Sequence, residues 1–137
     1  MVIRRRLPVI ALAVLATAGG LVLAGCGGGS SAPSQLVSPA AFARVVAAPG
    51  VMTLNVLGPG APTIAGTDLA IPADDLNAAA AQLPPISTRL AAYCWSGHTS
   101  ARAVQTLHDL GYKRIVELRG GMLAWQAAGL PLHTPGA

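Results

Sequence analysis

The sequence predicts an α/β domain with a mainly parallel central sheet flanked by helices. Three apolar segments of strand length, residues 51–57, 89–94 and 114–118, follow one another along the chain. Segments with helical spacing or composition separate these strands and follow the last one. Strands that alternate with helices usually pair in parallel, with the helices as crossovers. This order therefore predicts one α/β domain.

A helix and a strand begin the expected domain. The helix covers residues 38–48, because a serine that can cap it and a proline that fits its first turn stand at its start. A Pro-Gly pair ends it. The strand "VMTLNVL", residues 51–57, alternates loosely between the two faces of a sheet, and a loop rich in glycine and proline follows.

The second half of the expected domain contains helices and two more strands. An alanine-rich helix starts at Asp74 and ends before two prolines. The strand at 89–94 leads into a helix over residues 100–110, where apolar side chains recur at helical spacing and a glycine follows. The strand at 114–118 comes next, and a short last helix carries Trp125 as a core residue.

The N-terminal segment has the pattern of an export signal. Three arginines stand within residues 1–6, and residues 7–24 are uncharged and mostly apolar. The tetrapeptide Leu-Ala-Gly-Cys that ends at Cys26 resembles a bacterial lipobox, where the cysteine is lipidated and becomes the new N-terminus. The alternative is an uncleaved membrane span, for which the apolar segment is at the short limit.

The lipoprotein interpretation divides the chain into three parts. Residues 1–25 are a signal peptide that is removed, residues 26–37 are a lipidated cysteine with a flexible Gly/Ser/Pro tether, and residues 38–137 are the folded domain. The protein is then anchored at the outer face of the cell membrane. Because three of the nine basic residues leave with the signal, six basic and five acidic residues remain, and nothing indicates nucleic-acid binding.

Cys94 is left without a disulfide partner once Cys26 carries lipid. A single remaining cysteine in an exported protein is a reactive thiol or an intermolecular bridge. Packing in the core is the plain alternative, since free cysteines are commonly inert core residues. The sequence favours reactivity, because this cysteine stands where a strand meets a glycine-containing loop and a helix.

The loop "WSGHT" after Cys94 predicts a site for an anionic sulfur. Ligands bind at the carboxyl ends of parallel strands. Backbone N–H groups of the turn and the positive end of the following helix dipole both favour thiolate over thiol. Gly97 allows conformations in which several N–H groups converge on one point. Gly120 and Gly121 predict a tight turn close to this loop.

Residues 93–132 contain, in order, a Cys-x-x-Gly-x-x-Ser loop, a helix ending in Leu-Gly-Tyr, a Gly-Gly-x-x-x-Trp segment and a final Gly-Leu-Pro. This ordered set resembles the rhodanese-like sulfurtransferases. Upstream the likeness is looser, but it extends over about residues 38–132. The resemblance implies a rhodanese-like α/β fold. It also implies transfer of sulfane sulfur, through a persulfide, from a donor such as thiosulfate to a thiol or a cyanide-type acceptor.

That resemblance also implies roles for individual residues. Cys94 is the nucleophile, and no metal or other cofactor is needed. The expected partners are a small anionic sulfur donor and a thiol acceptor. The substrate-binding residues carried over from the family loop are Trp95, Ser96, Gly97, His98, Thr99 and Ser100.

Several family positions differ in this sequence. Family loops often carry arginines where Trp95 and Thr99 stand, and an Asp-x-Arg on the early strand is replaced by Asn55 and Leu57. An anionic donor would then be held mainly by backbone N–H groups. The alternative function is therefore a catalytically weak or inactive rhodanese-like module that binds a partner or senses oxidants at the cell envelope.

Other functions fit less well. Cysteine-dependent phosphatases clamp phosphate with an arginine six positions after the cysteine, and Ser100 stands there. A dithiol redox protein needs a second cysteine to resolve a disulfide. His98 is either a proton donor or a solvated loop residue, whereas His108 and His133 are expected at the surface without metal-ligand spacing. The sequence leaves the physiological sulfur donor and the oligomeric state open.

Overall fold

The computed structural model describes residues 33–136, which form a five-stranded sheet with helices on both faces. Every pair of neighbouring strands is parallel, in the order β1-β5-β4-β2-β3. The predicted α/β class with a parallel sheet is confirmed. The strands are β1 (Gln35–Val37), β2 (Val51–Asn55), β3 (Leu69–Ala70), β4 (Arg89–Tyr93) and β5 (Ile115–Leu118).

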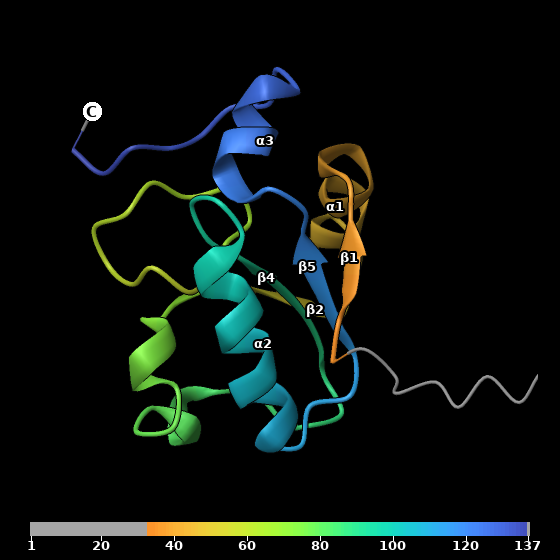
Figure 1. Cartoon of the computed structure of the whole chain (residues 1–137), viewed down its shortest axis with the longest axis vertical. Helices are drawn as coiled ribbons and strands as arrows, with labels where there is room; N and C mark the ends of the chain where they lie inside the picture. The colour runs from red at the N-terminus through yellow and green to blue at the C-terminus, as the bar shows by residue number, and fades with distance from the viewer. Residues whose placement is uncertain (1–32, 137) are drawn as a thin grey trace, which may run out of the picture.

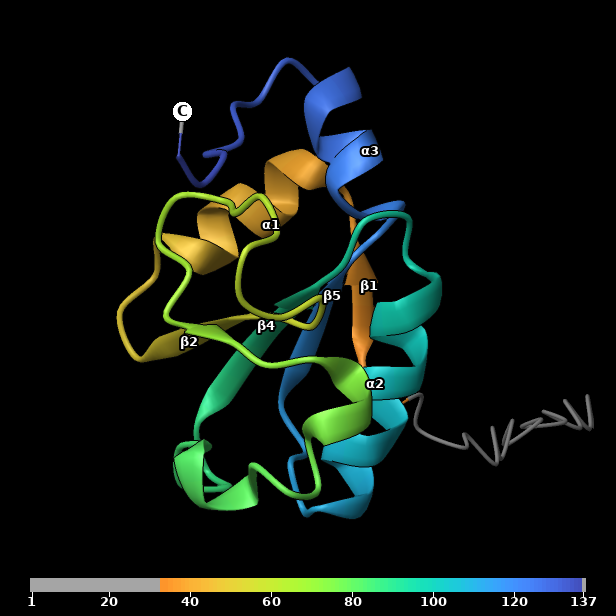
Figure 2. The ribbon, with the colours of Figure 1, turned by 90° about the vertical axis from the view of Figure 1, so that its left-hand side faces the viewer.

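The helices divide between the two faces of the sheet (Figures 1 and 2). Side chains of α1 (Pro39–Val46) and α3 (Gly121–Ala127) share one apolar cluster with Tyr93 and Leu118. Side chains of α2 (His98–Asp109) share the other cluster with residues of and around the short 3-10 helix η1 (Ala73–Asp75). The domain therefore has three layers.

Strand β4 is buried on both faces, which explains its continuous apolar sequence. Leu90 and Ala92 pack on the α2 side, and Ala91 and Tyr93 pack on the side of α1 and α3. Each of these four side chains is at most 1% exposed. The central strand that leads to Cys94 is therefore fixed from both sides.

Helix α1 follows the expected capping pattern. The Ser38 hydroxyl accepts a 3.3 Å hydrogen bond from the N–H of Ala41, and Pro39 occupies the first turn. Phe42 buries the inner face of the helix completely. Its ring meets Tyr93 and Trp125 edge-on, with centroids 6.2 and 6.3 Å away.

Four details of the predicted organisation are wrong. Strand β1 lies inside residues 26–37, predicted as a tether, so the folded domain begins no later than Gln35. Strand β3 is too short to show a pattern and was not predicted. The alanine-rich helix expected from Asp74 is instead two 3-10 turns, η1 and η2 (Ala80–Gln82). Helix α2 begins at His98, two residues before its predicted start.

The predicted signal peptide and the lipidation site Cys26 lie outside the described residues. Among residues 33–136, no helix is both long and apolar enough to cross a bilayer.

Candidate active site

The segment of residues 94–97 joins β4 to α2 and lies at the carboxyl edge of the sheet. It is called the reactive loop below. Cys94 follows directly on β4, and α2 starts four residues later. Gly97 precedes the helix with a φ of 100°, in the left-handed region that favours glycine. The predicted strand–glycine loop–helix junction is confirmed.

The sulfur of Cys94 makes two polar contacts among residues 33–136. It accepts a 3.0 Å hydrogen bond from the backbone N–H of Gly97. On its other side it donates to Oγ of Ser100, 3.4 Å away. Of the several N–H groups expected to converge on the sulfur, one does so. Cys94 is 1% exposed, so its sulfur is almost entirely shielded from solvent.

Glu117 lies behind Ser100 and was missed from the sequence. The Ser100 hydroxyl donates a 2.6 Å hydrogen bond to Oε1 of this glutamate, and the Ser34 hydroxyl donates a 3.1 Å bond to Oε2. Glu117 is 6% exposed. A signal was present, because a glutamate inside the apolar strand "IVEL" of a parallel sheet is a buried charge that needs a partner.

The first turn of α3 is hydrogen bonded to the backbone of the loop. The backbone N–H of Met122 donates a 2.9 Å bond to the Cys94 carbonyl, and that of Leu123 donates a 3.0 Å bond to the Trp95 carbonyl. A Cβ on Gly121 would lie 2.5 Å from the oxygen of Trp95 and 2.6 Å from that of Cys94. The expected proximity of Gly120-Gly121 to the loop is confirmed, and its cause is this close backbone approach.

The other predicted binding residues lie in the loop and the first turn of α2, and within residues 33–136 none of them makes a hydrogen bond to the sulfur. Trp95 is 42% exposed, Ser96 and His98 are also exposed, and Thr99 is half-buried. Residues 95–100, which comprise the rest of the loop and the first three residues of α2, therefore carry an exposed tryptophan and no arginine. Within residues 33–136 there is no group of three or more potential metal-ligating side chains.

Asn55 and Tyr93 support the neighbouring loop. Both polar groups of the Asn55 side chain bond the backbone, through Nδ2 to the Pro62 carbonyl and through Oδ1 to the N–H of Leu57, each at 3.0 Å. The Tyr93 hydroxyl accepts a 3.0 Å bond from the N–H of Ile64. Burial raises the pKa of Tyr93 above its ordinary value of 10.0. These residues shape the scaffold beside Cys94.

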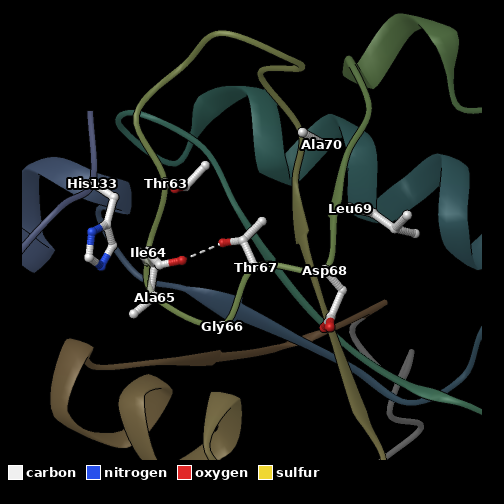
Figure 3. Close-up of a pocket in the computed structure, with 9 residues that line it drawn as sticks. All are labelled: Thr63, Ile64, Ala65, Gly66, Thr67, Asp68, Leu69, Ala70 and His133. Carbon is white, nitrogen blue, oxygen red and sulfur yellow. Dashed lines mark hydrogen bonds between the residues drawn. The ribbon is translucent and has the colours of Figure 1, made fainter. Parts of the chain in front are cut away.

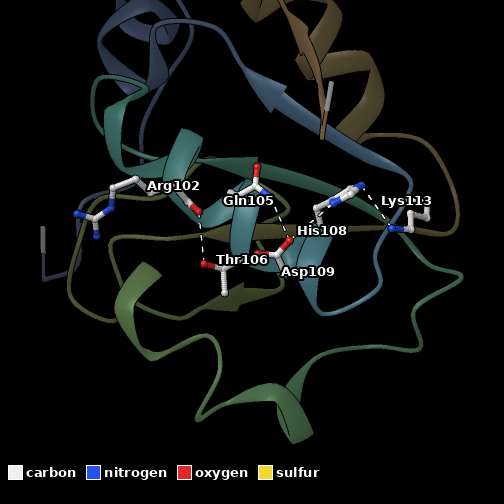
Figure 4. A network of polar contacts seen from close by, with 6 residues as sticks. All are labelled: Arg102, Gln105, Thr106, His108, Asp109 and Lys113. Atoms are coloured by element: carbon white, nitrogen blue, oxygen red, sulfur yellow. Dashed lines mark hydrogen bonds and ion pairs between the residues drawn. The ribbon is translucent and has the colours of Figure 1, made fainter. Parts of the chain in front are cut away.

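The remaining histidines lie apart from the loop. His133 lines a hollow of about 450 Å³ with residues 63–70, and this lining includes no residue of the reactive loop (Figure 3). His108 belongs to a surface network along α2, where Gln105 bonds Asp109 at 3.0 Å and Lys113 lies 3.4 Å from His108 (Figure 4). The lining of this hollow includes no thiol, so the loop that follows Cys94 is the better candidate site.

Comparison with known proteins decides the family. The family model described as "Rhodanese-like domain" matches residues 52–128, more than half of the chain. The chain belongs to the rhodanese-like domain family. The matched range contains the whole Cys94 loop and the glycine pair that holds it.

Solved structures share the fold of this rhodanese-like domain. A rhodanese-related protein from Thermoplasma volcanium is 27% identical, with a TM-score of 0.61, over 72% of this chain and 96% of that one. A thiosulfate sulfurtransferase from Pseudomonas aeruginosa is 26% identical, with a TM-score of 0.62. That match covers 74% of this chain and 19% of the larger protein.

Curated relatives match the rhodanese-like domain over shorter segments. A sulfurtransferase from Allochromatium vinosum is 46% identical over 43 residues, 31% of this chain and 40% of the relative. An uncharacterised protein from Synechocystis is 49% identical over 39 residues, 28% of this chain and 22% of the relative. The chain thus spans well under two thirds of the length of these relatives. The comparisons support a family of sulfurtransferase type.

Proposed function

We propose that this protein is a membrane-anchored sulfurtransferase in which Cys94 carries sulfane sulfur as a persulfide. The observation that carries the proposal is the position of Cys94. Its sulfur lies at the carboxyl edge of a parallel sheet, 3.0 Å from the N–H of Gly97 at the start of α2. Backbone N–H groups and a helix N-terminus stabilise negative charge on sulfur.

The proposed reaction has two displacements. Deprotonated Cys94 attacks the outer sulfur of a donor such as thiosulfate, the S–S bond of the donor breaks, and sulfite leaves with the bonding electron pair. The persulfide on Cys94 is then attacked at its outer sulfur by a thiolate or by cyanide. The bond between the two sulfurs of the persulfide breaks, and the Cys94 thiolate is restored.

The loop favours sulfur donors whose binding does not require an arginine side chain. Two neighbours in the comparison, the sulfurtransferase from Allochromatium vinosum and the thiosulfate sulfurtransferase from Pseudomonas aeruginosa, support sulfur transfer as the reaction class. No cationic side chain apart from His98 stands in residues 95–100. Thiosulfate is therefore proposed as a weak donor, held by backbone N–H groups.

Sulfur loading and turnover test this function separately. The protein is incubated with thiosulfate or another sulfane sulfur donor, and its mass is measured intact and after digestion. We expect one added sulfur on Cys94 and none on a Cys94→Ser variant. With cyanide present, thiocyanate should form only with the wild-type thiol. Equal behaviour of wild type and variant across several donors would overturn the proposal.

A binding or redox-sensing module is the second candidate. The near-complete burial of Cys94 and the lack of loop arginines favour it. A module of this kind would retain the fold and bind its partner without turnover. Persulfide formation on Cys94 followed by transfer to a thiol would exclude it, whereas oxidation of Cys94 without sulfur transfer would support it.

Anchoring is tested on the full chain. We propose that residues 1–25 are removed and that Cys26 is lipidated, on the basis of the basic, apolar and lipobox segments. In bacterial cells, the chain should partition into membranes, and its mass should show a lipid on Cys26. A mature chain that retains residues 1–25, or that carries no lipid on Cys26, would contradict lipid anchoring.

A further inference from the structure

Glu117 is the one buried carboxylate of the domain. All five acidic residues of the chain lie within residues 33–136, and the four aspartates are exposed. Glu117 takes part in neither of the two ion pairs found among these residues. Its oxygens are instead hydrogen bonded by the hydroxyls of Ser34 and Ser100. A buried carboxylate without a cation is costly, and the reactive loop lies next to it.

The single proton of the Ser100 hydroxyl is directed away from the sulfur. Oε1 of Glu117 lies 2.6 Å from Ser100 Oγ, and the carbonyl oxygen of Gly97 lies 3.2 Å from it. Both acceptors compete for the same hydrogen, and the carboxylate makes the stronger bond. The Ser100 oxygen then meets Cys94 as an acceptor, 3.4 Å from Sγ. An acceptor stabilises a thiol S–H but not a thiolate.

We propose that Glu117 is a positioning residue that acts on Cys94 through Ser100. Its carboxylate takes the Ser100 proton, leaves an oxygen lone pair facing the sulfur, and so holds resting Cys94 as a thiol. The inference rests on the proposed role of Cys94 as the sulfur-accepting nucleophile. The effect of Glu117 on the sulfur is opposite to that of the Gly97 N–H, which favours negative charge on the same atom.

Charged groups on the surrounding elements do not offset Glu117. On α2 the nearest in sequence to Ser100 are His98 and Arg102, both exposed, and Arg102 pairs with Asp74. Arg119 after β5 is exposed, and β1 has no titratable residue. On β4 the cation is Arg89, at the opposite end of the strand from Cys94. Within the described residues, the carboxylate behind Ser100 therefore has no ion-pair partner that would weaken its hold on the Ser100 proton.

The test is the alkylation of Cys94 by iodoacetamide at neutral pH, followed by mass spectrometry. Glu117→Gln keeps the shape but replaces the acceptor-only carboxylate with a neutral amide, which is a weaker acceptor for the Ser100 hydroxyl. We expect the alkylation rate to rise by about tenfold or more, the size of one hydrogen bond to a charged group. In a Ser100→Ala background, the same substitution should change the rate by less than about twofold, because the two residues act as a unit.

Asp109→Asn is the matched control, since it removes one exposed negative charge at the far end of α2. Its alkylation rate should stay at the wild-type value. A rate for Glu117→Gln that is unchanged or lower would overturn the proposal. So would an equal effect of Glu117→Gln in the presence and absence of Ser100.

The wild-type protein provides a second measurement that depends on no variant of Glu117. At neutral pH, the reduced chain should show no more thiolate ultraviolet absorbance than Cys94→Ser. Absorbance of a full thiolate would contradict the proposal. Neither measurement uses a sulfur donor. Failure of sulfur loading would therefore overturn the proposed function, while these results decide the position of the proton.

Discussion

The backbone N–H of Met122 donates a 2.9 Å hydrogen bond to the carbonyl of Cys94, so the first turn of α3 and the reactive loop form one unit. This contact requires the α3 backbone to approach the loop at Gly121 more closely than a side chain allows. The geometry of the sulfur therefore depends on a residue that never touches it.

Gly121→Ala tests this dependence. The new Cβ would lie 2.5 Å from the Trp95 carbonyl oxygen, and φ at this position is +60°. We expect a loss of about 2–4 kcal/mol in unfolding free energy, from backbone strain and the clash together, and a loss of sulfur loading. Urea unfolding and intact mass measure the two effects. Gly129→Ala is the control, because φ is +77° there but nothing lies within 4 Å of the new Cβ. Equal stability of the two variants would contradict the explanation.

Thr53→Val should stabilise the domain or leave it unchanged. Among the described residues, Oγ1 of Thr53 is buried without a hydrogen-bond partner. A valine of the same shape removes that unsatisfied group, with an expected gain of about 1 kcal/mol. Thr67→Val is the matched comparison, because the Thr67 hydroxyl bonds the Ile64 carbonyl at 2.6 Å and the Tyr93 hydroxyl at 2.7 Å. The thermal unfolding midpoint should fall for Thr67→Val and should not fall for Thr53→Val.

Tyr93→Phe should destabilise the domain in a pH-dependent way. At neutral pH the loss is about 1–3 kcal/mol, because the buried N–H of Ile64 loses its acceptor. Burial raises the pKa of Tyr93 in the folded state above 10.0, so above pH 10 the unfolded chain loses this proton first. The unfolded state then binds fewer protons than the folded state, and stability falls as pH rises.

The stability difference between wild type and Tyr93→Phe should therefore be constant below pH 10 and shrink above it. Denaturant unfolding at a series of pH values measures this. The pKa of Tyr112 is also raised by burial, and that residue is present in both proteins, so its contribution cancels in the difference. A gap that stays constant or widens in alkali would contradict the assignment.

Trp95→Arg should improve the use of thiosulfate. Trp95 is 42% exposed, so an arginine fits there without repacking the core. A guanidinium beside the loop adds a charged hydrogen-bond donor for the anion. We expect KM for thiosulfate to fall by about fivefold, with stability within about 0.5 kcal/mol of wild type. Trp95→Ala separates loss of the indole from gain of the charge. If both variants lower KM equally, the guanidinium is not the cause.

The sequence predicted the fold well where patterns were long. The capped helix α1, the apolar strand β4 and the periodic helix α2 were all foreseen close to their observed bounds. Strand β1 escaped detection because its three residues follow a Gly/Ser-rich segment and are mostly exposed, so no alternation marks them. The alanine-rich segment after Asp74 buries Leu76 and Ala79 at helical spacing, yet it forms two 3-10 turns, so apolar spacing alone does not distinguish these turns from one helix.

The sequence predicted only those site residues that lie close together along the chain. Cys94, Gly97 and Ser100 are close in sequence, and a loop motif therefore reveals them together. Glu117 comes from a different strand and joins them only because β5 lies beside β4, with Glu117 opposite Ala92. The spacing of residues along the chain does not reveal which strands pair. A charged residue within a strand buried on both faces was the remaining clue.

The parallel register separates the two ends of the domain. The chain enters β1 at the amino edge of the sheet, and Cys94 leaves β4 at the opposite edge. A domain held from the side of residue 33 therefore has the edge of the sheet that carries the buried Cys94 facing away from whatever holds it. Diffusing reagents could approach without passing between the protein and its support, and the holding segment could vary in length without disturbing the chemistry.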